Sequence, residues 1–178
     1  MPALILFFGT ASGLLVAGFM LGGLLFIGED GSGAAGSQAV GYLTMLVSLS
    51  LIFIAVKRHR DRNLGGVIKF GQAFLLGLGV ALLASLFYVA AWEIAFPFIG
   101  EDFMQAYLAS ETERLQTELD AEEAARKIGE LQAMMERYQN WWFRMPITLI
   151  EILPVGLLIT LISAGVLRNP NILPARAG

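Results

Sequence analysis

The sequence contains no cysteine and a single histidine, His59. Without cysteine the chain has no disulfide framework, and cysteine usage gives no information about its redox compartment. One histidine without cysteine partners is a poor zinc site. The serine and threonine residues of the apolar runs lack a histidine base, and no cluster of metal ligands is present, so we expect no enzyme activity. We also expect no cofactor and no nucleic-acid partner.

Charged residues are also scarce. Charged residues make up 15% of the chain, against about 25% in an ordinary soluble domain. Hydrophobic residues reach 56%, and the mean hydropathy is +0.67. A soluble domain of 178 residues has no interior large enough for this apolar surface, whereas a lipid bilayer can accommodate it. The composition therefore indicates an integral membrane protein, with the bilayer as its first partner.

Four apolar runs have the length of membrane spans, which need roughly 20 residues. They cover residues 3–27, 40–56, 72–98 and 145–167. The first run is longer than the apolar stretch of a signal peptide and no basic residues precede it, so we expect it to be retained as a span. We predict an all-α fold: one membrane domain, residues 1–178, built as a bundle of four transmembrane helices.

Residues 101–144, between the third and fourth runs, are polar, acidic and almost free of turn residues. Asp120 followed three residues later by Glu123 is typical of a helix N-cap with its capping-box partner. Apolar residues then recur at helical spacing, at Ala124, Ile128, Leu131, Met135 and Tyr138. The segment therefore predicts a helical hairpin, with helices over about 102–117 and 121–139 that meet near Leu119.

The distribution of basic residues predicts the orientation. Between the second and third runs lie five bases, Lys57, Arg58, Arg60, Arg62 and Lys69. The first loop carries Glu29 and Asp30 and no base. Because lysine and arginine in short loops resist translocation, we expect a cytoplasmic basic loop, cytoplasmic N- and C-termini, and an extracytoplasmic segment 101–144. Trp92, Trp141 and Trp142 are expected at the outer headgroup level, which amphipathic rings favour.

Several stretches, taken together and in order, resemble a known family. They cover residues 41–53, 57–62, 64–74, 85–88, 102–104, 151–157 and 161–164. In this pattern and spacing, the chain is similar over nearly its whole length to the small four-span bacterial membrane proteins of domain-of-unknown-function family 4199. The resemblance implies a multi-pass protein of the bacterial inner membrane, and it implies no activity.

Glu93 and Glu151 are the two acids that lie well inside apolar runs. An ionised carboxylate there costs a few kcal/mol unless it is paired or hydrated. One interpretation is a proton or cation site in which the two carboxylates share a proton. The other is structural: Arg144, Thr148 and Glu151 follow one helical stripe, so Arg144 can reach Glu151 and neutralise it.

Pro154 lies three residues after Glu151, inside the fourth run. A proline removes one helical hydrogen bond and clashes with the carbonyl four residues earlier. Such a kink can expose carbonyls at a transport site, or it can serve helix packing alone. Together, the candidate polar site consists of Glu93, Arg144, Thr148, Glu151 and Pro154.

Small residues recur at four-residue spacing, which lets membrane helices approach closely. The stripes are Gly9-Gly13-Ala17, Gly18-Gly22, Gly77-Ala81-Ser85 and Gly156-Thr160-Ala164. They predict packing within the bundle or, through the first span, a homodimer.

Two function classes remain. The first is an accessory or assembly protein whose outer helices contact a membrane-protein partner. The alternative is a small transporter or proton pathway that uses Glu93 and Glu151.

Overall fold

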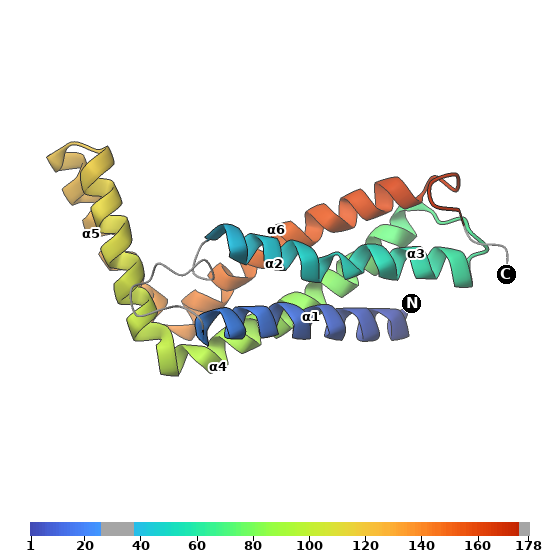
Figure 1. Cartoon of the computed structure of the whole chain (residues 1–178), viewed down its shortest axis with the longest axis horizontal. Helices are drawn as coiled ribbons and strands as arrows, with labels where there is room; N and C mark the ends of the chain where they lie inside the picture. Colours follow the sequence, from blue (N-terminus) through green and yellow to red (C-terminus); the bar gives the residue numbers. More distant parts are fainter. Residues whose placement is uncertain (26–37, 175–178) are drawn as a thin grey trace. The chain divides into compact units, whose positions relative to one another are not determined.

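The computed structural model describes residues 1–25 and 38–174. Outside the described residues lie the end of the first predicted span, the predicted first loop with Glu29 and Asp30, and Arg176. The described residues contain helices and no strand (Figure 1). The helices are α1 (Pro2–Leu25), α2 (Gln38–Leu49), α3 (Leu51–Asn63), α4 (Phe70–Glu118), α5 (Ala121–Tyr138) and α6 (Trp141–Leu167). The predicted all-α fold class is therefore confirmed.

Four stretches among the described residues are helical, long and apolar enough to cross a membrane. They are Pro2–Gly23, Ala39–Asn63, Phe70–Glu118 and Trp141–Leu167. Each contains or overlaps one predicted span. The described residues thus contain four apolar helical stretches of spanning length, which is the membrane-protein architecture that the apolar runs predict.

The second predicted span consists of two helices rather than one. α2 ends at Leu49 and α3 begins at Leu51. Between them, the Ser50 hydroxyl donates a hydrogen bond of 2.6 Å to the carbonyl of Val47, an example of a side chain that competes with the regular helical pattern. Two residues before Ser50, the carbonyl of Ser48 accepts a buried hydrogen bond of 2.6 Å from the Ser12 hydroxyl of α1.

α4 corrects the predicted start of the first helix outside the third span. The change from apolar to polar composition after Phe98 suggested a new helix from about residue 102, but α4 runs without a break from Phe70 to Glu118, with Pro97 inside it. After Phe98 the composition becomes polar because the surroundings of the helix become polar. The glutamate-rich stretch that follows still favours helix, so the helix continues.

The next break lies where the cap signature predicts it. α4 ends at Glu118 and α5 begins at Ala121. The Asp120 carboxylate accepts hydrogen bonds from the backbone N–H groups of Glu122 and Glu123, at 3.1 and 2.9 Å. This satisfies donors that the first turn of a helix otherwise leaves unpaired. The Glu123 side chain lies 3.3 Å from the Lys127 ammonium.

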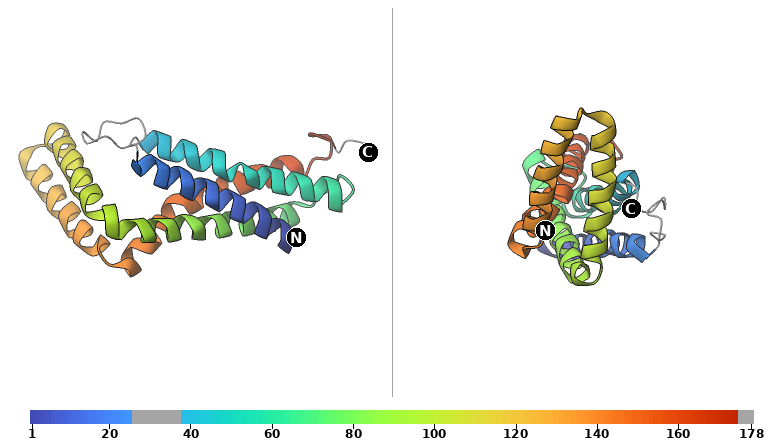
Figure 2. Two further views of the ribbon diagram at one scale, coloured as in Figure 1. Left: turned by 60° about the horizontal axis from the view of Figure 1, so that its bottom comes forward. Right: turned by 90° about the vertical axis from the view of Figure 1, so that its left-hand side faces the viewer.

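The chain divides into two compact units. Unit 1 comprises Met1–Ala91 and Leu149–Gly178, and unit 2 comprises Trp92–Thr148. In unit 1, α1 packs against α2 and α3, which follow one another along its length (Figures 1 and 2). Val16, Leu49, Ile52, Val80 and Ile152 are fully buried in its core.

Glycines bring the helices of unit 1 close together. A Cβ atom on Gly13 would lie 2.6 Å from the Phe87 side chain, and one on Gly9 would lie 2.8 Å from Leu83. Gly156 approaches Ala81 in the same way. These stripes therefore pack within the bundle, as one of the two interpretations predicts. Gly18 differs, because a Cβ atom there would meet nothing within 4 Å.

This contrast gives a matched pair of substitutions. Gly13→Val should lower the free energy of unfolding by about 1–3 kcal/mol, because Phe87 must move to admit the new side chain. Gly18→Val should change it by less than about 1 kcal/mol, because the site is open and glycine itself is a poor helix former. Thermal unfolding in detergent measures both. Equal effects of the two variants would contradict the close approach of α1 and α4.

Candidate functional site

Arg144, near the start of α6, binds Glu93 of α4 within unit 2. Its Nε donates to one carboxylate oxygen at 2.8 Å and its Nη2 to the other at 2.5 Å. The two side chains are 6% and 16% exposed, so both charges are largely removed from solvent. Paired, parallel hydrogen bonds of this kind are the strongest form of an arginine–carboxylate contact.

The same guanidinium also holds the end of α5. Its Nη1 donates to the backbone carbonyls of Tyr138 and Gln139, each at 3.1 Å. These are among the carbonyls that the C-terminus of a helix leaves without intrahelical partners. The guanidinium carbon lies 3.6 Å from the centre of the Phe96 ring, a distance that permits a cation–π interaction.

Aromatic rings enclose this pair. The Trp92 indole N–H donates a hydrogen bond of 3.0 Å to the Tyr138 hydroxyl, and the Trp92 ring lies edge-on to Phe96 and Phe103. Trp92 is 7% exposed, so it is a core residue of unit 2 rather than a ring at the surface. Trp141, by contrast, is 62% exposed, as a headgroup anchor would be.

The arrangement corrects the expected partner of Arg144. The helical stripe suggested Glu151, but the guanidinium is engaged by Glu93, two carbonyls and Phe96. Since both oxygens of Glu93 accept hydrogen bonds from one cation, this carboxylate is neutralised in place. We call Glu93, Arg144, Phe96 and Tyr138 the arginine clasp; it joins α4, α5 and α6 within unit 2.

Glu151 belongs to unit 1 and has a different partner. Its carboxylate accepts a hydrogen bond of 3.2 Å from the hydroxyl of Tyr88, a buried residue of α4. Glu151 itself is exposed on the surface of the helices. Glu93 and Glu151 thus lie in different compact units, each with its own hydrogen-bonding partner.

The other two candidate residues have local roles. The buried Thr148 hydroxyl donates to the carbonyl of Arg144 at 3.1 Å, within the same helix. α6 continues through Pro154, whose ring is exposed. Two residues later, Gly156 packs against Ala81.

Arg60 is a buried cation that the sequence reasoning missed. Its place among the five bases between the second and third apolar runs predicts a residue of the basic loop, but its side chain is 0% exposed. Its guanidinium donates to the Asp61 carboxylate at 2.7 Å, to the Ile172 carbonyl at 2.9 Å, and to the Leu173 carbonyl. The Leu173 backbone has a φ of +48°, which non-glycine residues rarely adopt. The positive-inside pattern counts charges and cannot show that one of them is buried.

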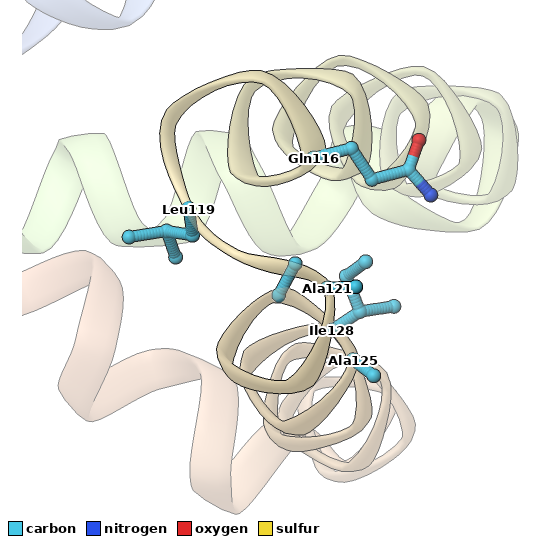
Figure 3. Close-up of a pocket in the computed structure, with 6 residues that line it drawn as sticks. Gln116, Leu119, Ala121, Ala125 and Ile128 are labelled. Carbon is cyan, nitrogen blue, oxygen red and sulfur yellow. The ribbon is translucent and has the colours of Figure 1, made fainter.

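α5 leaves much of its surface exposed. Among α5 residues, Ala124 is buried, while the other apolar positions of its helical face are half-buried: Ile128, Leu131, Met135 and Tyr138. A groove of about 300 Å³ lies at the turn between α4 and α5. Its lining is mostly apolar, with Ala121, Ala125 and Ile128 from α5 and Gln116 from α4 (Figure 3).

The described residues contain no group of three or more histidine, cysteine or acidic side chains placed to hold a metal ion. Comparison with known families finds a match over residues 8–169, to the family described as "Protein of unknown function (DUF4199)". No curated protein matches the chain, and no solved structure matches it. The match confirms the resemblance inferred from the residues and brings no activity with it.

Proposed function

Since this chain belongs to the DUF4199 family of proteins of unknown function, we propose its role from its geometry: an accessory or assembly protein of the bacterial inner membrane. In this role unit 1 is the membrane anchor, and the α4–α5 surface of unit 2 binds a membrane-protein partner or a second copy. It acts through contact rather than catalysis. The observation that carries the proposal is the half-buried apolar face of α5.

Two features of unit 2 support a contact role. First, a helix whose apolar stripe stays half-exposed gains stability when another helix covers it. Second, the arginine clasp fixes the end of α5 against α4 and α6, so the surface is already ordered before binding. Binding then loses less conformational entropy, and this loss is one of the costs that oppose association.

The alternative, a small transporter or proton pathway through Glu93 and Glu151, has weaker support. Both oxygens of Glu93 are engaged by Arg144. A carboxylate held this way exchanges protons only after a buried ion pair is broken, which is energetically costly.

We also propose that both termini and the loop over residues 57–69 are cytoplasmic, while residues 101–144 face outward. A cysteine introduced at Gln116 should react in whole cells with a membrane-impermeant thiol reagent, and one at Asn63 should react only after the cells are opened. The chain has no native cysteine, so the background is low. The reverse pattern would overturn the orientation.

Position-specific photo-cross-linking tests the contact. A photoreactive residue at Ile128, on the half-buried face, should give one discrete adduct in native membranes. The same residue at Gln132, an exposed position of α5, is the matched control and should give little. Mass spectrometry of the adduct distinguishes a different protein from a second copy of this chain. Equal labelling at both positions, or none at Ile128, would contradict the proposal.

A further inference from the structure

One end of unit 1 gathers segments that are far apart in sequence. Val56 of α3, Ile68 of the following turn and Leu167 of α6 share one buried cluster. Arg60 adds hydrogen bonds to the carbonyls of Leu167 and Ile172. The end of α3, the turn over 64–69 and residues 167–173 therefore form one surface, which we call the basic end.

Acidic groups neutralise only part of the charge at the basic end. Asp61 pairs with Lys57 and with the buried Arg60. Four exposed bases remain: Arg58, Arg62, Lys69 and Arg168. In the described part of the chain, no carboxylate lies within ion-pair distance of any of these four. They form a cationic surface that the described residues leave without a paired carboxylate.

Exposed apolar side chains lie among these bases. Val67 is 59% exposed and Phe70 is 41% exposed, on either side of Lys69. Leu173, held by its hydrogen bond to Arg60, is 52% exposed. A surface that alternates cations with apolar side chains at the edge of an apolar bundle matches a membrane interface, where headgroups and acyl chains meet.

We propose that the basic end binds the headgroups of anionic phospholipids. Each exposed base contributes a factor of roughly five in affinity for an anionic membrane surface. Val67, Phe70 and Leu173 enter the acyl region beside the headgroup, a contact that a water-soluble phosphate lacks. Arg60 positions this surface, because it ties residues 172–173, and with them Arg168, to the end of α3. The proposal stands independently of the contact role of α5.

Ligand-dependent thermal unfolding tests the proposal on the full-length protein in a neutral detergent. Short-chain phosphatidylglycerol should raise the Tm in a saturable way, since a ligand that binds the folded state stabilises it. Phosphatidylcholine of the same chain length should raise it much less, and inorganic phosphate should leave it unchanged. An equal rise with phosphatidylcholine would overturn charge recognition. A rise with inorganic phosphate alone would show that the ligand is a soluble anion.

Variants locate the site. Arg58→Gln and Arg168→Gln should each raise the half-saturating concentration of phosphatidylglycerol roughly fivefold, and the triple variant Arg58→Gln, Arg62→Gln, Lys69→Gln roughly a hundredfold. Arg62→Lys keeps the charge and should bind like the parent. Arg137→Gln removes an exposed base from α5 of unit 2 and is the matched control. If the triple variant fails to fold, the two single variants decide. Unchanged binding in both would overturn the site.

Discussion

Arg144→Met should lower the free energy of unfolding by about 3–5 kcal/mol, because it leaves the Glu93 carboxylate largely buried without its cation. Glu93 is only 16% exposed, so water restores little of the lost stabilisation. The substitution also removes both hydrogen bonds to the α5 carbonyls. Glu93→Gln should cost less, because the arginine keeps those carbonyls and the Phe96 ring.

Thermal or denaturant unfolding of the protein in detergent measures these differences. The double variant Arg144→Met with Glu93→Leu should recover part of the loss, since replacing a buried ion pair by apolar side chains is often nearly neutral. Recovery should stay incomplete because the carbonyls of Tyr138 and Gln139 lose their donor. Glu151→Gln is the control and should have a small effect, since an amide oxygen can also accept the hydrogen bond from Tyr88 and no cation is left unpaired. If Glu151→Gln proved as damaging as Arg144→Met, the assignment of Glu93 as the partner would be wrong.

Arg60→Met should lower the free energy of unfolding by about 3 kcal/mol, the scale of several charge-assisted hydrogen bonds lost from a buried site. The carbonyls of Ile172 and Leu173 would lose their donor, and Leu173 would lose the contact that holds its unusual φ. Asp61 would keep Lys57 as a partner, so no buried charge is left entirely alone. We therefore expect a smaller effect than at Arg144.

The Arg60 effect should be local as well as global. Residues 168–174 should become more susceptible to proteolysis and lose hydrogen-exchange protection, because Arg60 ties this segment to α3. Arg62→Met, two residues along the same helix at an exposed position, is the control and should change stability by no more than about 0.5 kcal/mol. An unchanged protection pattern in Arg60→Met would contradict the role of Arg60 in holding residues 172–173.

The helices could be predicted from sequence because their causes are local. Long runs without charge require a bilayer, and the length of each run sets a span. Asp120 caps α5 through N–H groups two and three residues away. Because both partners are neighbours in the sequence, a short sequence motif is enough to predict this contact. The prediction of a new helix from about residue 102 was wrong for a related reason. Composition reports the environment of a helix, whereas helix continuity depends on backbone hydrogen bonds, which glutamate-rich sequence also supports.

The sequence by itself determined the fold class, the four apolar helices, the cap at Asp120 and the family. Only the tertiary structure decided which acid Arg144 meets, since Glu93 lies 51 positions away on another helix, while the spacing rule that favoured Glu151 considers a single helix. It likewise decided that Arg60 is buried, because its carbonyl partners lie 107 to 113 positions away. A guanidinium in low dielectric binds whichever acceptors folding brings to it, and that choice depends on the packing of helices distant in sequence.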